Sequence, residues 1–128
     1  PTNTQFNIKK SPGGLSDIDF IFSFLILSNP DLLTERNGNS IISSFDMIKK
    51  ISNKDINFDQ LKRNYTLLKQ IELFNQIVFN SRLSKIPAEE LKIKKLSKEC
   101  GFSNSKLFLE KMNEITGQIK KYYQNIFN

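Results

Sequence analysis

Apolar residues recur at intervals of three and four along most of the chain, which is the spacing of an amphipathic α-helix. Five stretches show this pattern, at about residues 15–27, 40–51, 58–82, 87–101 and 103–127. No stretch alternates apolar and polar residues in the way that a half-buried strand does. We therefore predict an all-α fold, a five-helix bundle whose helices are joined by short connections.

Capping signals support these five stretches. Residues that favour helix starts lie at the beginning of each one: Ser16, Ser40, Asn57 or Asp59, Pro87, and Ser103 or Ser105. Asn29-Pro30 is expected to end the first helix and Gly101 the fourth. The fourth helix carries the apolar residues Leu91 and Leu96.

The first helix and the residues before it organise the prediction. The stretch from Leu15 to Leu27 is apolar on all sides of its axis, which predicts a central, mostly buried first helix. Residues 1–14 are polar and end in Pro-Gly-Gly, so we expect an extended arm there. The arm is expected to lead into a helical bundle domain at residues 15–128.

Composition narrows the kinds of function. The chain has 16 Lys and 3 Arg spread along its length, whereas nucleic-acid-binding surfaces cluster Arg, so the net charge of +6 does not indicate a nucleic-acid partner. The absence of His excludes Ser-His triads and most zinc sites. The single cysteine, Cys100, is expected to be a packed residue rather than a nucleophile. With no span-length apolar run and no cleavable signal, we expect a cytoplasmic protein without a membrane partner.

The candidate chemistry lies in the stretch Pro12-Gly13-Gly14-Leu15-Ser16-Asp17-Ile18-Asp19-Phe20. On a strand, Asp17 and Asp19 would project from one face and could share a metal ion, as in polymerase-β-like nucleotidyltransferases. At a helix start they would diverge by about 200° and could not. The long apolar run and the capping signals favour the helix, with no metal site. The Gly-Gly pair is then expected to make a tight turn close to a neighbouring element.

The same stretch resembles the Gly-Gly-Leu-x-Asp-Ile-Glu-Phe signature of the glutamine synthetase adenylyltransferase/adenylyl-removing family, in the helical domain that follows a catalytic domain. A related domain occurs in the uridylyltransferase of the PII signal protein. The similarity continues in order through Pro30-Asp31-Leu32-Leu33 to Ile126-Phe127. Two departures are Asp19, where the family has Glu, and Leu73-Phe74, where it has His-Arg. The second departure favours the C-terminal, adenylylating half of that enzyme.

The resemblance implies a fragment of a larger nucleotidyltransferase that transfers AMP from ATP to a tyrosine of glutamine synthetase. It marks Gly13, Gly14, Leu15, Asp17, Asp19 and Phe20 as the motif and interdomain turn. It implies no catalytic residue in this chain, with Asp17 and Asp19 as supporting acids. ATP and Mg²⁺ are implied for the complete enzyme and no cofactor for the chain itself. The implied partners are an upstream nucleotidyltransferase domain, glutamine synthetase and the PII signal protein. The alternatives are the equivalent bundle of the adenylyl-removing half or of PII uridylyltransferase, and a stand-alone interaction module without activity.

Overall fold

The computed structural model describes residues 6–29, 56–80, 82 and 84–127. This part of the chain contains four helices: α1 (Leu15–Leu27), α4 (Phe58–Val78), α5 (Glu90–Glu99) and α6 (Ser105–Phe127). Its only strand-like feature is an isolated antiparallel bridge between Asn7 and Lys85. The predicted all-α class is thus confirmed for the described residues. The helix predicted at 40–51 lies outside them, so the count of five helices stays a prediction.

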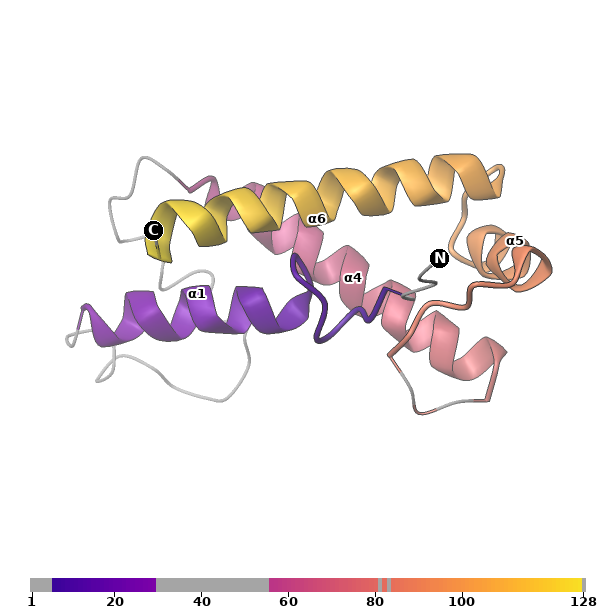
Figure 1. The fold of residues 1–128 in the computed structure, drawn as a ribbon, viewed down its shortest axis with the longest axis horizontal. Coiled ribbons are helices and arrows are strands. Elements are labelled where there is room, and N and C mark those ends of the chain that lie inside the picture. Colours follow the sequence, from indigo (N-terminus) through magenta and orange to yellow (C-terminus); the bar gives the residue numbers. More distant parts are fainter. Residues whose placement is uncertain (1–5, 30–55, 81, 83, 128) are drawn as a thin grey trace.

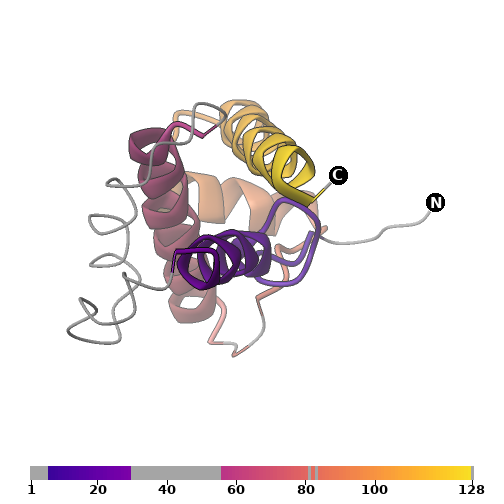
Figure 2. The ribbon, with the colours of Figure 1, turned by 90° about the vertical axis from the view of Figure 1, so that its left-hand side faces the viewer.

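The four helices enclose one hydrophobic core. Helices α1 and α6 run side by side in the same direction, and α4 crosses behind them (Figure 1). The short helix α5 packs against both α4 and α6 and closes one end of the bundle. Figure 2 shows the same arrangement from the end of α1, with α4 and α6 on different sides of it. The core side chains without any solvent exposure come from all four helices and from the segment before α1: Ile8, Ile18, Ile21, Leu61, Leu68, Ile71, Leu96, Phe108, Ile115 and Ile119.

Helix α1 is buried on one side only, so the prediction of a mostly buried first helix is wrong. Its buried residues are Leu15, Ile18, Ile21, Phe22, Leu25 and Ile26. Phe20 and Leu27 are 58% and 70% exposed, and Phe24 also reaches the surface. Apolar residues on all sides of a helix do not determine how many other elements pack against that helix. Among the described helices, α1 has substantial contacts with α4 and α6 alone.

The start of α4 follows the sequence closely, whereas its end does not. Asn57 is the N-cap, and its side-chain oxygen accepts a hydrogen bond from the N–H of Gln60 at 3.0 Å. The helix was expected to continue to about residue 82, but it ends at Val78. Asn80 adopts a left-handed backbone conformation, with φ of 47°, which ends the helix.

The prediction that Pro87 lies in the first turn of α5 is wrong, because the helix begins at Glu90. The residues just before Pro87 are held as extended backbone, where the N–H of Ile86 donates to the carbonyl of Phe6 at 2.8 Å. Leu96 is fully buried, whereas Leu91 is 81% exposed, because five residues place it about 140° around the helix from Leu96. Gly101, with φ of 88°, ends the helix as predicted.

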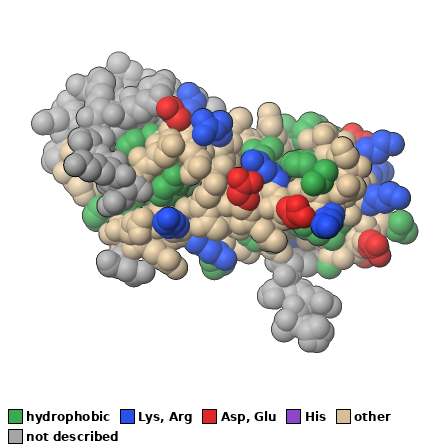
Figure 3. Space-filling model, turned by 90° about the horizontal axis from the view of Figure 1, so that it is seen from above, with side chains coloured by type: hydrophobic (Ala, Val, Ile, Leu, Met, Phe, Trp, Pro, Cys, Tyr) green, Lys and Arg blue, Asp and Glu red, His purple; other side chains and the backbone are tan. Residues whose placement is uncertain are grey.

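Helix α6 begins at Ser105, one of the two predicted starts. Its cap is Asn104, however, whose side-chain oxygen accepts from the N–H of Leu107 at 2.9 Å. On the surface of the molecule on the α6 side, basic and acidic side chains lie interspersed with apolar ones (Figure 3). None of the described helices combines the length and the apolar character that crossing a membrane requires.

Candidate functional site

Residues 6–14 form a compact loop, which we call the N-terminal loop, rather than a free extended arm. Its backbone N–H and C=O groups form hydrogen bonds both with the segment after α4 and with the start of α1. The N–H of Ile8 donates to the carbonyl of Ser84, and the N–H of Leu15 donates to the carbonyl of Ile8, both at 2.8 Å. The side-chain oxygen of Asn7 accepts from the N–H groups of Lys9 and Lys10 at 3.0 and 2.9 Å. The described part of the predicted arm is therefore packed into the fold, and Ile8 is fully buried. The domain boundary at residue 15 stays a prediction.

The Gly-Gly pair makes the close approach that the sequence predicted. Gly13 has φ of 82° and lies against α6, where an added Cβ would be 2.5 Å from the carbonyl oxygen of Thr116. At Gly14, an added Cβ would be 2.4 Å from the carbonyl oxygen of Ile8. Gly14, not the predicted Ser16, is the N-cap of α1. Both glycines are needed because neighbouring backbone fills the space that a side chain would take.

Asp17 caps the start of α1 from inside the helix. It is the third helical residue, and its Oδ2 accepts a hydrogen bond of 2.7 Å from the N–H of Gly13. This contact matches the backward reach of the acidic residue in a capping box, displaced by one position. The carboxylate thus fixes the Gly-Gly turn to the helix and suits the positive end of the helix dipole.

Replacing Asp17 with alanine should lower the free energy of unfolding by about 1 kcal/mol, because the N–H of Gly13 loses its acceptor. Urea unfolding followed by circular dichroism measures this loss. Glu110→Ala is the control, since Glu110 is an exposed acid on α6 and its loss should change the free energy of unfolding by less than about 0.5 kcal/mol. Equal effects of the two substitutions would contradict the capping role of Asp17.

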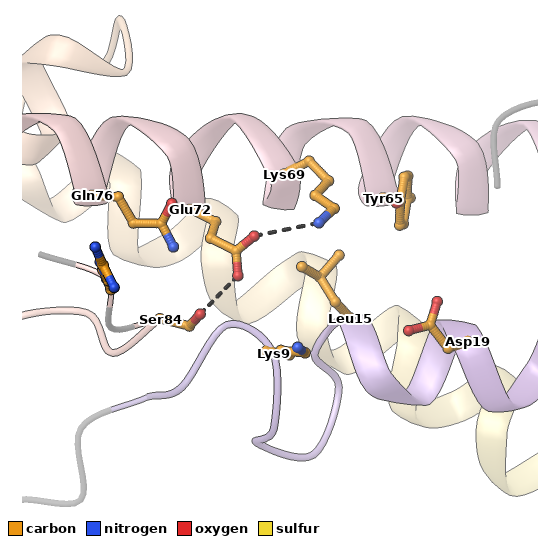
Figure 4. A pocket seen from close by; sticks show the side chains of 9 residues that line it. Lys9, Leu15, Asp19, Tyr65, Lys69, Glu72, Gln76 and Ser84 are labelled. Atoms are coloured by element: carbon orange, nitrogen blue, oxygen red, sulfur yellow. Dashed lines mark hydrogen bonds and ion pairs between the residues drawn. The ribbon is translucent and has the colours of Figure 1, made fainter. Parts of the chain in front are cut away.

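Asp19 points away from the cap and into a pocket, so the predicted divergence of the two acids is confirmed. The pocket has a volume of about 360 Å³ and lies between α1 and α4 (Figure 4). Its walls come from the N-terminal loop, both helices and the segment after α4: Lys9, Leu15, Asp19, Tyr65, Lys69, Glu72, Gln76, Arg82 and Ser84. Within the described chain, the carboxylate of Asp19 has Lys69 and Lys9 as charged neighbours but forms no side-chain hydrogen bond or ion pair.

The inner carboxylate of the pocket, Glu72, is fully engaged by its neighbours. Its Oε2 accepts a hydrogen bond of 2.8 Å from the hydroxyl of Ser84, and its Oε1 lies 3.4 Å from Nζ of Lys69 (Figure 4). Only 12% of the Glu72 side chain is exposed. Glu72 therefore ties α4 to the segment at residue 84, and Asp19 is the carboxylate that is left to meet a ligand or a partner.

Burial raises the pKa of Asp19 above its ordinary value, and the charges of Lys69 and Lys9 offset only part of this effect. The pKa of Tyr65 is also raised, mainly by burial and further by Asp19 and Glu72, while Lys69 opposes the shift. Titratable groups with perturbed pKa values in a pocket are characteristic of functional sites. The pocket is thus the best candidate site among the described residues.

Replacing Asp19 with asparagine should raise the free energy of unfolding near neutral pH. The pKa of Asp19 is above 3.8 in the folded chain, so folding favours the protonated form, and its contribution to stability falls as pH rises through the folded pKa. Urea unfolding at several values between about pH 4 and pH 7 should show the variant's advantage shrinking toward the acid end. Glu110→Gln is the control, and an Asp19→Asn variant less stable than the natural chain at neutral pH would contradict this prediction.

Sequence reasoning found only one side of this pocket. Asp19 and Leu15 belong to the recognised motif, but Lys69, Glu72 and Ser84 were not singled out as a site. No sequence signal could show that Ser84, beyond the end of α4, returns to contact Glu72.

The remaining candidates have structural explanations. The pKa of Cys100 is raised to about 11 by burial and by the charge of Glu99, so its thiol is protonated and unreactive at neutral pH. Among the described residues, no group of three His, Cys, Asp or Glu side chains comes together to hold a metal ion. Phe20, the last motif residue, lies on the exposed side of α1.

The family model described as GlnD PII-uridylyltransferase matches residues 1–127. The chain belongs to this family. Among curated proteins, none matches the chain. Membership supports a helical domain in the context of a nucleotidyltransferase-type enzyme, and it agrees with the domain type that the motif suggested. Which group is transferred, and to which protein, goes beyond membership.

The departure at Leu73-Phe74 lies on the surface of α4. Leu73 and Phe74, which replace His-Arg of the resembled signature, are both exposed on α4. Neither lines the pocket between α1 and α4. Leu73 and Phe74 therefore belong to the outer surface of α4 and not to the described pocket.

Proposed function

We propose that this chain is the helical domain of an enzyme that transfers AMP from ATP to a tyrosine of glutamine synthetase. In this proposal the bundle completes the cleft beside an upstream nucleotidyltransferase domain, and the pocket between α1 and α4 faces that domain. The observation that carries the proposal is the family match over residues 1–127, which covers the motif and all four described helices. The choice of AMP and glutamine synthetase rests on the resemblance of the stretch from Gly13 to Phe20.

The two acids of the motif divide the work in this proposal. The carboxylate of Asp17 accepts the hydrogen bond from the N–H of Gly13 and stabilises the Gly-Gly turn. Asp19 lines the pocket with Lys9 and Lys69 nearby, and burial holds its pKa above the ordinary value. Asp19 is therefore the acid that would meet a cationic or backbone group of the catalytic domain, or the substrate itself.

ATP and Mg²⁺ are expected to bind in the catalytic domain. The described residues of this chain offer no group of three side chains that could hold a metal ion, and Glu72 is already engaged by Lys69 and Ser84. We therefore assign no step of the transfer to a metal held here, and we expect the 128-residue chain alone to be inactive. Glutamine synthetase is the proposed target, and the PII signal protein is a further proposed partner.

A second candidate is the equivalent helical domain of a PII uridylyltransferase. The specific observation in its favour is the description of the matching family, which names that activity. The two candidates share the same place for the bundle beside a nucleotidyltransferase domain. They differ in the nucleotide that is transferred and in the acceptor protein.

A transfer assay on the complete gene product separates the candidates. The enzyme is incubated with Mg²⁺ and either ATP or UTP, and with either glutamine synthetase or PII, and the mass of each acceptor is measured. We expect glutamine synthetase to gain the mass of one AMP in the reaction with ATP, and neither acceptor to be modified in the reaction with UTP. UMP on PII would replace the first candidate by the second. Release of AMP from modified glutamine synthetase would assign the adenylyl-removing half, and a gene product without a catalytic domain would indicate a stand-alone module.

The role of Asp19 is tested by Asp19→Asn in the complete enzyme. We expect kcat to fall at least about tenfold while the unfolding temperature does not decrease, because the substitution removes a pocket charge and no internal hydrogen bond. Asp17→Asn is the matched control on the same helix turn. It should weaken the cap, lower the unfolding temperature and leave kcat nearly unchanged. An unchanged kcat in Asp19→Asn would reject a role for Asp19 in the transfer.

A further inference from the structure

We propose that the N-terminal loop, including its Gly-Gly turn, is a rigid coupling and not a hinge. Two adjacent glycines before a helix commonly suggest a flexible joint. Here the contacts of residues 6–16 instead join the start of α1, the segment at residues 84–86 and α6 into one body. The coupling follows from contacts within this chain, and only its consequence for an upstream domain rests on the proposed function.

Backbone hydrogen bonds fasten the loop on two sides. Toward the segment after α4, the N–H of Ile8 donates to Ser84 and the N–H of Ile86 donates to Phe6, each at 2.8 Å. Toward α1, the N–H of Ser16 donates to the carbonyl of Lys9 at 2.9 Å. A hinge needs backbone groups that can change partners at little cost, whereas this loop is also anchored in the core by the fully buried side chain of Ile8.

The Gly-Gly turn itself has no space in which to rotate. The backbone at Gly13 is packed against Thr116 so closely that even a methyl group would overlap the carbonyl oxygen and the Cβ of that residue. The N–H of Gly13 is also held by the carboxylate of Asp17 at 2.7 Å. Rotation about Gly13 would have to break this hydrogen bond and lift the loop from α6.

The segment that receives the loop is itself fixed to α4. The buried side chain of Asn75 donates from Nδ2 to the carbonyl of Lys85 at 2.9 Å, and Ser84 donates to Glu72. Lys9 and Ser84, which both line the pocket, therefore lie in two segments that the bridge between Asn7 and Lys85 holds together. A displacement of the N-terminal loop would therefore move Lys9 and Ser84, and with them this side of the pocket. Under the proposed function, the position of the catalytic domain would in this way set the shape of the pocket.

Hydrogen exchange and nuclear spin relaxation on the 128-residue chain test the rigidity directly. We expect the amides of Ile8, Leu15 and Ser16 to have protection factors within about tenfold of those in the core of α1, such as Ile21. Backbone order parameters at Gly13 and Gly14 should be near about 0.85. Protection more than about a hundredfold lower, or order parameters below about 0.6, would identify a hinge and overturn the proposal.

The coupling to the pocket is tested by loosening the loop at Asn7, a half-buried residue whose side-chain oxygen accepts from the N–H groups of Lys9 and Lys10. Asn7→Ala should speed amide exchange at Ile86, across the bridge, at least about fivefold more than at Leu96 in α5. Asn104→Ala is the matched control, because it removes a similar cap at the start of α6 and should leave Ile86 unaffected. An unchanged exchange rate at Ile86 in Asn7→Ala would overturn the coupling. Neither measurement depends on an activity, so their failure is distinct from failure of the proposed function.

Discussion

Gly13→Ala is expected to lower the free energy of unfolding by at least about 3 kcal/mol, because two separate costs fall on one methyl group. The first is the backbone, since φ of 82° lies in the region that residues with a Cβ rarely adopt. The second is space, since the new Cβ would be 2.5 Å from the carbonyl oxygen of Thr116 and 2.8 Å from its Cβ. Both contacts are with the rigid part of α6, which cannot give way as a flexible side chain could.

Gly117→Ala is the matched control for this substitution. Gly117 is the next residue along α6 after Thr116, and an added Cβ there would meet nothing within 4 Å. Alanine favours a helix interior over glycine, so this variant should gain up to about 1 kcal/mol. Urea unfolding followed by circular dichroism measures both variants. A loss below about 1 kcal/mol in Gly13→Ala would show that the N-terminal loop does not rest on α6 in this way.

The helical elements could be predicted because their signals are local. The spacing of Phe58, Leu61, Tyr65 and Leu68 gives the inward face of α4, and Asn57 marks its start. The end of α5 at Gly101 is equally local, since glycine accepts the left-handed conformation that ends a helix. Such features depend on residues within one or two turns, which the sequence displays directly.

The errors concern positions where tertiary contacts decide. Pro87 suits a first helical turn, yet the bridge between the N-terminal loop and residues 84–86 keeps the chain extended and delays α5 until Glu90. The apolar circumference of α1 could not reveal that Phe20 would remain exposed, because that depends on which helices pack against it.

The candidate site shows the same division between local and distant information. The motif predicts that Asp17 and Asp19 lie at a helix start and are the candidate supporting acids. The pocket itself depends on Glu72 and Ser84, which are 12 residues apart in sequence and meet only because the chain turns back after α4. A sequence pattern carries no direct record of such a return. The structure therefore adds the pocket's second wall and separates the roles of the two acids.

Phe108 on α6 lies close to the segment that follows α5 and to the N-terminal loop. Its side chain is fully buried, and its ring meets that of Phe102 edge to face with centroids 5.4 Å apart. It also borders an apolar hollow of about 100 Å³ that Phe6 and Ile86 line from the other side. The contacts of this one ring thus reach the residues that fasten the N-terminal loop.

Phe108→Ala should lower the free energy of unfolding by about 3–5 kcal/mol, since it removes a buried ring and enlarges a hollow that its rigid surroundings cannot close. Leu107→Ala is the control at the adjacent position, where the side chain is 46% exposed, and it should cost less than about 1 kcal/mol. Urea unfolding of both variants gives the comparison. If the two losses were equal, the ring of Phe108 would not be the fully buried core contact that the structure shows.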